Sequence, residues 1–308
     1  MIVTVTLNPA LDITYTVPEL KTGTTHRPRV FAQAGGKGVN VARTLHALGR
    51  ETVAVLPLGG FDGAAVRAEL ETSGVPHHAI PISGATRRTV TVVETESPTG
   101  LATSFNEAGP ELTPDEWTEI TAAIAMLLET AVLDTSPVLV LSGKLPPGLA
   151  DDAYAELVTL ADDFGVPTIL DTEGTPLLAA LPAHPAIVKP NAHELLDATG
   201  LTDPKAAAAE LLKRGARAVV SSNGPEGLSA LTPDGSWTAR PPRINGGNPT
   251  GAGDASVAAL AIGLADATPW PQTLADAAAL SAATVLTDRA GFFDAEVYRR
   301  FKTEITAC

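Results

Sequence analysis

Short and almost continuous apolar runs recur along the chain and predict strands that are buried on both faces. They are rich in Val, Ile and Leu, as in parallel sheets that helices cover on both sides. The predicted strands span residues 2–7, 53–58, 138–141, 168–171, 187–189 and 218–221.

Helical segments separate these strands, and capping residues mark where the helices begin and end. Residues 113–116 (Thr-Pro-Asp-Glu) have the order of an N-cap, a first helical position and the closing residue of a capping box. Residues 151–164 and 203–215 form further helices that end at glycine. Strands that alternate with helices predict an α/β fold, with a mostly parallel sheet flanked on both faces.

One region breaks this rhythm, because its apolar and polar positions alternate with period two. Residues 89–94 and 101–105 show the alternation, and Ser97-Pro98-Thr99-Gly100 between them predicts a turn. The pattern indicates a β-hairpin with one polar face, and residues 29–33 add a further strand.

A small antiparallel sheet inserted into an α/β domain is typical of a lid. We expect one domain spanning residues 1–308, with a lid formed by segments within about 12–34 and 84–108. The alternative is an edge hairpin that has no role in binding.

The composition narrows the classes of function. The 308 residues carry a formal net charge of −14, which argues against a nucleic-acid partner because phosphate backbones need a basic face. The single cysteine, Cys308, excludes an intrachain disulfide and fits a reducing cytosol. The first apolar run has no basic start, and the apolar runs are too short to span a membrane. We expect a soluble, cytoplasmic protein.

Residues 247–260 (GNPTGAGDASVAAL) carry the strongest chemical signal. The glycines expose backbone N–H groups, and the Ala-rich stretch that follows predicts a helix. The N–H groups of Gly251 to Asp254 would then form an anion hole, and the Asp254 carboxylate would accept the proton of a hydroxyl that attacks phosphorus. The alternative is an aspartate that caps a core helix.

Residues 34–49 form a second glycine-rich loop that leads into a helix. Gly36 lets a ligand approach the backbone, and Lys37 and Asn40 add a charge and an amide. The spacing matches neither a Walker A loop nor a dinucleotide-binding fingerprint. The alternative is a plain turn with a solvated lysine.

Residues 188–196 (VKPNAHELL) place an amide and a carboxylate just after a predicted strand. Asn191 and Glu194 share one face of a helical turn, where they could hold a hydrated Mg²⁺. The alternative, about equally supported, is a capping box in which Asn191 caps the helix and Glu194 closes it.

A fourth motif, at residues 221–227 (SSNGPEG), is a polar turn directly after a strand. Ligands of α/β proteins bind at the carboxyl ends of parallel strands, although most such turns are only turns.

The ordered set of motifs resembles the ribokinase-like sugar kinases, also called the phosphofructokinase B family, over essentially the whole chain. Asn8-Pro9-Ala10 with Asp12, residues 141–149 (LSGKLPPGL) and residues 171–174 (DTEG) look like its 1-phosphofructokinase and tagatose-6-phosphate kinase branch. The resemblance implies a three-layer sandwich with a mostly parallel central sheet and a small antiparallel β lid.

The resemblance also implies roles for single residues. Asp254 is the base, and the anion hole lies at Gly251, Ala252 and Gly253. The sugar is held by Asp12, Gly36, Lys37 and Asn40, and its existing phosphate by Arg88 together with Lys37 or Asn106. The nucleotide is held by Lys189, Ser222, Gly224, Glu226, Gly227, Gly251 and Gly253. Asn191 and Glu194 organise Mg²⁺ through water.

The implied reaction transfers the γ-phosphoryl group of ATP to a phosphorylated ketohexose. Fructose 1-phosphate would give fructose 1,6-bisphosphate, with tagatose 6-phosphate and fructose 6-phosphate as alternative substrates. A more distant alternative is a catalytically silent sugar-phosphate sensor on the same fold. A homodimer through the lid and a monovalent-cation requirement are further implications of the resemblance. Lys144, Pro249 and Asn223 depart from the branch's usual residues.

Overall fold

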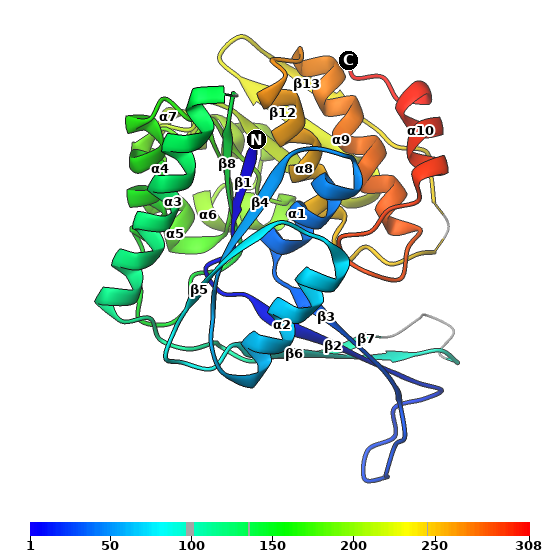
Figure 1. The fold of residues 1–308 in the computed structure, drawn as a ribbon. Coiled ribbons are helices and arrows are strands. Elements are labelled where there is room, and N and C mark those ends of the chain that lie inside the picture. Colours follow the sequence, from blue (N-terminus) through cyan, green and yellow to red (C-terminus); the bar gives the residue numbers. More distant parts are fainter. Residues whose placement is uncertain (97–101, 135, 245) are drawn as a thin grey trace.

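A large sheet forms the centre of the molecule (Figure 1). The structure, a computed structural model, describes residues 1–96, 102–134, 136–244 and 246–308, and within them this sheet has nine strands. In spatial order the strands are β13 (Gly235–Ala239), β12 (Leu228–Thr232), β11 (Val219–Ser222), β10 (Ile187–Val188), β9 (Thr168–Asp171), β8 (Val138–Ser142), β1 (Ile2–Val5), β4 (Thr52–Leu58) and β5 (His77–Pro81). Strands β11 to β5 run parallel, and β12 and β13 pair antiparallel at one edge.

Helices cover both faces of this sheet, so the predicted three-layer α/β architecture is confirmed (Figure 1). One layer contains α3 (Pro114–Asp134), α4 (Ala153–Asp163), α5 (Gly174–Ala180), α6 (Ala192–Thr199) and α7 (Pro204–Lys213). The other contains α1 (Lys37–Ala47), α2 (Gly60–Ser73), α8 (Ala252–Ala265), α9 (Trp270–Val285) and α10 (Ala295–Glu304). Across the described ranges, no helix has both the length and the apolar character that crossing a membrane requires.

Side chains that alternate along each strand divide between two hydrophobic cores. In β8, Leu139 and Leu141 pack toward the α3–α7 layer, whereas Val138 and Val140 pack toward α1, α8 and α9. This explains the continuous apolar runs in the sequence, because each strand must present an apolar side chain to both layers.

Two helices begin at the capping residues that the sequence predicts. Glu116 accepts a hydrogen bond from Thr113 N (2.8 Å), and Glu116 N donates to Thr113 Oγ1 (3.2 Å), which closes the predicted capping box. Asp203 accepts from Ala206 N and so caps α7.

A second sheet projects below the main one and forms the lid (Figure 1). Its strands, in spatial order, are β3 (Arg29–Gly35), β2 (Ala10–Val17), β6 (Arg87–Glu94) and β7 (Ala102–Asn106). The outer pairs are antiparallel, as predicted, and the central pair β2–β6 is parallel. The predicted turn at Ser97-Pro98-Thr99-Gly100 and the first residue of the second predicted strand, Leu101, lie outside the described residues.

Candidate active site

The two glycine-rich loops meet at the start of two helices. Gly36 precedes α1 with φ 114°, and Gly251 precedes α8 with φ 85°. A Cβ atom on Gly251 would lie 2.8 Å from Ala290 Cα, so this position suits glycine for both its backbone angle and its space. As predicted, Ala252, Gly253 and Asp254 form the first turn of α8, where backbone N–H groups have no acceptor inside the helix.

One backbone N–H group of the predicted anion hole already has a hydrogen-bond acceptor within the chain. The Ala252 N–H donates to the backbone carbonyl of Pro249 (3.1 Å). The N–H groups of Gly253 and Asp254 therefore remain the better placed donors toward an anion at the helix terminus.

Asp254 is buried beside the start of α1, with only 7% of its surface exposed. Asn40 Nδ2 donates a 2.8 Å hydrogen bond to Asp254 Oδ2. Burial, followed by repulsion from Asp171, raises the pKa of Asp254 to about 7, against the lowering effects of Asn40, Lys37 and Lys189. A carboxyl with a pKa near neutrality is suited to accept a proton as a general base.

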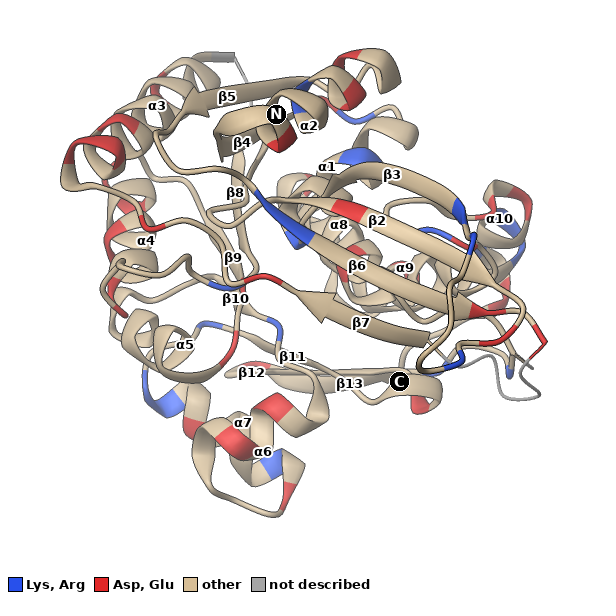
Figure 2. Cartoon of the chain, turned by 90° about the horizontal axis from the view of Figure 1, so that it is seen from below, with Lys and Arg blue, Asp and Glu red and all other residues tan. Residues whose placement is uncertain are grey.

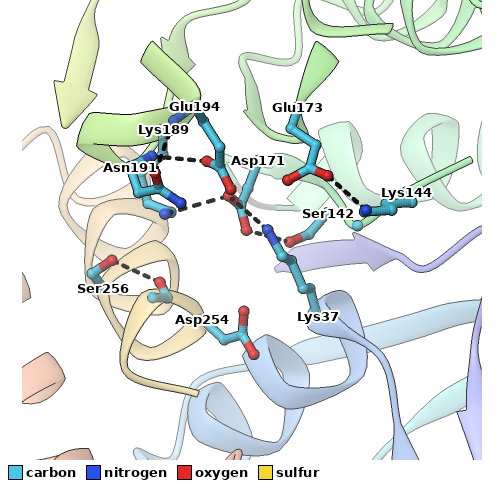
Figure 3. A network of polar contacts seen from close by, with 12 residues as sticks. Lys37, Ser142, Lys144, Asp171, Glu173, Lys189, Asn191, Glu194, Asp254 and Ser256 are labelled. Atoms are coloured by element: carbon cyan, nitrogen blue, oxygen red, sulfur yellow. Dashed lines mark hydrogen bonds and ion pairs between the residues drawn. The ribbon is translucent and has the colours of Figure 1, made fainter. Parts of the chain in front are cut away.

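Asp171 joins two lysines of the site into one charged cluster (Figure 3). Its Oδ1 lies 3.3 Å from Lys189 Nζ and 3.5 Å from Lys37 Nζ, and Ser142 Oγ donates to its Oδ2 (3.0 Å). Burial alone would raise the pKa of Asp171. The two lysines and Ser142 outweigh the effect of burial and hold this pKa below its usual value. The cluster therefore keeps two ammonium groups beside Asp254.

Lys37 remains protonated in this cluster. Burial alone would lower its pKa, but the carboxylates of Asp171, Asp254 and Glu194 outweigh burial and raise the pKa to about 12. Lys189 Nζ lies 3.6 Å from where a Cβ atom on Gly253 would stand, so it reaches the first turn of α8.

In the structure, Asn191 and Glu194 form the capping box that was one of the two alternatives. Glu194 N donates to Asn191 Oδ1 (2.9 Å), and Asn191 N donates to Glu194 Oε2 (2.8 Å). This contact does not exhaust the acceptor capacity of the carboxylate, which has about four lone-pair sites. Within the described part of the chain, no three acidic, His or Cys side chains form a metal cage. One or two carboxylates suffice for Mg²⁺ that keeps its waters and binds phosphates, so the residues fit this ion.

The polar turn after β11 lies next to this capping box. Asn191 and Ser222 form an isolated parallel bridge, and Ser222 N donates to Pro190 O (3.2 Å). A short 3-10 turn, η2 (Gly224–Glu226), follows Asn223 and closes with the Asn223 N–Gly227 O bond (2.9 Å). Of the predicted nucleotide residues, Lys189 follows β10, and Ser222 is the last residue of the neighbouring strand β11. Gly224, Glu226 and Gly227 come directly after β11.

One face of the lid carries two of the predicted sugar-binding residues, Asp12 and Asn106. Thr89 donates a short hydrogen bond to Asp12, and in register Thr89 lies opposite Asn106, so the three side chains share a face. Burial raises the pKa of Asp12, whereas Thr89 and Arg87 oppose the rise. Arg87 is half-buried and donates to Asn8 O (3.2 Å). Figure 2 shows the basic start of β6 beside an acidic segment of β2.

The structure does not bring Arg88 to this face. Side chains alternate along a strand, so Arg88 points to the opposite side of the lid from Arg87 and Thr89. There it pairs with Asp62 of α2 at 2.9 and 3.0 Å. The assignment of Arg88 rested on the family resemblance, whereas the arginine that shares the face of Asp12 and Thr89 is Arg87.

Two further residues of the site were not singled out from the sequence. Asp171 was noted only within the DTEG run, and Glu173 follows it at the N-cap position of α5. Asp171 is the last residue of a predicted strand and Glu173 follows two positions later, and the carboxyl ends of parallel strands meet at one edge. That placement was the signal that could have identified them.

Comparison with known proteins shows the family of this chain. A family model described as pfkB family carbohydrate kinase matches residues 5–295. A 1-phosphofructokinase of Xanthomonas campestris pv. campestris is 40% identical over 274 residues, which cover 86% of this chain and 84% of that protein.

Solved structures show the same fold. The tetrameric inhibited form of phosphofructokinase-2 from Escherichia coli has a TM-score of 0.89 and 28% identity, over 98% of each chain. Ribokinase from Arabidopsis thaliana, solved with ribose and ATP, has a TM-score of 0.75 and 22% identity over 98% of each chain, which shows the fold alone. The chain belongs to the pfkB family of carbohydrate kinases.

Proposed function

We propose that this chain transfers the γ-phosphoryl group of ATP to fructose 1-phosphate and forms fructose 1,6-bisphosphate. The observation that carries the proposal is the buried Asp254 carboxylate at the N-terminus of α8, held by Asn40 beside two lysines. The choice of substrate follows the 1-phosphofructokinase that is 40% identical to this chain.

Asp254 acts as the general base in this proposal. Its carboxylate accepts the proton of the C6 hydroxyl while that oxygen forms a bond to the γ-phosphorus. The bond from the γ-phosphorus to the oxygen shared with the β-phosphate breaks, and ADP leaves with that electron pair. Asn40 donates to one carboxylate oxygen, which leaves the other oxygen to face the hydroxyl.

Hydrogen-bond donors and ammonium groups in fixed positions stabilise the negative charge on the transferred phosphoryl group. The first turn of α8 offers N–H groups at the positive end of the helix dipole. Lys189 and Lys37 add ammonium groups that Asp171 holds in place, so these groups need little reorganisation during the reaction. Ala252 is the least available donor of the turn, because its N–H is bonded to Pro249.

The nucleotide lies over the ends of β10 and β11 in this proposal. Residues Ser222 to Gly227 form its cradle, and Glu194 with Asn191 would hold a hydrated Mg²⁺. When bound, this ion neutralises charge on the β- and γ-phosphates. Because phosphofructokinase-2 of Escherichia coli is known in complex with potassium, activity should also be measured with and without K⁺.

The sugar phosphate is held between the core and the polar face of the lid. Asp12, Asn106 and Asn40 supply carboxylate and amide groups for sugar hydroxyls, and Gly36 permits close approach to the backbone. Arg87 is the arginine that shares this face, and a guanidinium fork can grip a phosphate through two hydrogen bonds. A closed lid would keep water from accepting the phosphoryl group.

The opposite face of the lid supports pairing with a second copy of the chain. It carries Ile13, Tyr15, Val90 and Phe105, and α2 covers its end at Leu11. Phe105 is 60% exposed, which is unusual for a large apolar side chain on a strand. A second lid packed on this face would bury these side chains and form the proposed homodimer.

A substrate panel tests the proposed activity. ADP release by the purified protein should be measured with fructose 1-phosphate, fructose 6-phosphate, tagatose 6-phosphate, fructose, ribose and a nucleoside, all with MgATP. We expect the highest kcat/KM for fructose 1-phosphate. Faster turnover of free ribose or of the nucleoside than of any sugar phosphate would refute the proposal.

A further inference from the structure

Lys144 lies in a loop at the same edge of the sheet as the candidate active site. It follows β8, while Glu173 follows β9 and Glu194 lies in the first turn of α6 after β10. These three strands are neighbours and run parallel, so the three side chains gather at one end of the sheet (Figure 3).

The three side chains form a charged chain. Lys144 Nζ lies 2.7 Å from Glu173 Oε1, and the Glu173 carboxyl interacts electrostatically with that of Glu194. Two neighbouring carboxylates repel each other unless a proton or a cation compensates them. Lys144 supplies that cation from within the chain.

This ion pair differs from the other ammonium contacts of the site. Lys189 is 5% exposed and is locked onto the buried Asp171, whereas the Lys144 side chain is 75% exposed and that of Glu173 is 39% exposed. Exposed ion pairs contribute little free energy, so the Lys144–Glu173 contact can exchange partners readily. Lysine is also a flexible point charge that can follow an anion.

We propose that Lys144 is a positioning residue that holds Glu173 before the metal–nucleotide complex binds and then exchanges it for the nucleotide. Glu173 would then help Glu194 to hold a hydrated divalent cation, and the Lys144 ammonium would pair with the nucleotide phosphates. The inference rests on the proposed nucleotide site and adds to it a built-in cation that competes with the metal.

Binding of Mn²⁺ to the nucleotide-free protein, followed by electron paramagnetic resonance, tests the first half of the exchange. In Lys144→Met the competing ammonium is gone, so Mn²⁺ should bind about two- to fivefold more tightly than in the wild type. Lys302→Met is the matched control, because Lys302 pairs with Asp276 at 2.9 Å on α9 and α10, away from the site. Unchanged Mn²⁺ affinity in Lys144→Met would overturn the inference.

Binding of MgATP, followed by calorimetry on the same proteins, tests the second half. Lys144→Met should bind MgATP more weakly, again by about two- to fivefold, since a phosphate contact is lost. If Lys144 had only a structural role, Lys144→Met would bind both Mn²⁺ and MgATP more weakly. That outcome would also overturn the proposed exchange.

A double-mutant cycle tests whether the effect runs through Glu173. In a Glu173→Gln background, Lys144→Met should no longer tighten Mn²⁺ binding, because the carboxylate that the two cations share is absent. Fully additive effects would contradict the inference. Failure of the proposed function is distinguishable, since it would appear as a wild-type protein that transfers no phosphoryl group from ATP.

Discussion

Asn40 Nδ2 donates a 2.8 Å hydrogen bond to Asp254 Oδ2 and thereby joins the first turns of α1 and α8. The two residues are 214 positions apart, and each belongs to one of the two glycine-rich motifs. The contact fixes the orientation of a buried carboxylate without neutralising it. It also lowers the pKa that burial raises, and so keeps Asp254 usable as a base near neutral pH.

Replacing Asp254 with asparagine should abolish most of the turnover. Asn keeps the shape of the side chain but cannot accept the hydroxyl proton, and loss of a general base typically costs on the order of 10²–10⁴ in rate. ATP affinity, measured by calorimetry, should stay within about twofold because the helix terminus is intact. An unchanged kcat in this variant would rule out Asp254 as the base.

The pH dependence of kcat/KM should show an acid limb near pH 7. A pKa of about 7 means that Asp254 is protonated and inactive below that pH and deprotonated and active above it. In Asn40→Ala the hydrogen bond that lowers this pKa is lost, so the limb should move to higher pH. A limb that stays near pH 4 in both proteins would show that burial does not govern this carboxyl.

Patterns that are local in sequence predicted their structures well. The apolar runs became strands of the parallel sheet, and both glycine loops begin helices. For Asn191 and Glu194 the sequence left two interpretations open, and the capping box is present. Capping depends on atoms within one turn, so spacing alone determines it. Metal binding depends on partners elsewhere, and that interpretation stays a prediction.

Features that depend on register or strand order could not be predicted in this way. Arg87 and Arg88 are adjacent and chemically identical, and only the pairing of β6 with β2 decides which of them faces Asp12. Asp171 was visible at the end of a predicted strand, but its two lysine partners come from α1 and from the end of β10. The edge strands β5 and β13, and β12 next to β13, lack the continuous apolar pattern and were not predicted.

Asp171→Asn should change both stability and pH dependence. Removing the charge leaves the buried Lys189 without its carboxylate, and loss of one partner of a buried ion pair costs about 3 kcal/mol of unfolding free energy. The pKa of Asp254 should fall, because repulsion from Asp171 raises it while the lysines lower it.

Urea unfolding and the acid limb of kcat/KM measure these two effects. Asp276→Asn provides the control, since Asp276 pairs with Lys302 and Tyr298 away from the site. An acid limb that moves upward in Asp171→Asn would contradict the electrostatic account of the site.

If the lids form the dimer interface, a single charge introduced on the apolar face of the lid should separate the subunits. Phe105→Asp would place a carboxylate in the interface and should weaken dimerisation at least about tenfold in sedimentation velocity. Phe61→Asp is the matched control, because Phe61 is 95% exposed on α2 rather than on the lid. A wild-type protein that remains monomeric at micromolar concentration would exclude the lid dimer.

Two neighbouring arginine variants can decide which side chain binds the sugar phosphate. Arg87 shares a face with Asp12 and Thr89, so Arg87→Ala should raise KM for the sugar phosphate about 10- to 100-fold, the value of one or two charge-assisted hydrogen bonds. KM for ATP should change far less, because β6 lies in the lid.

Arg88→Ala is the matched control, since it removes the same charge one residue further along the strand. Its partner is Asp62 on α2, so KM for the sugar phosphate should stay within about twofold, as expected for an exposed ion pair. The reverse result, a large effect from Arg88 and a small one from Arg87, would restore the assignment made from the sequence. It would also mean that the lid turns its other face to the substrate when it closes. Equal increases in KM for the sugar phosphate and for ATP in Arg87→Ala would instead make Arg87 a structural residue of the lid.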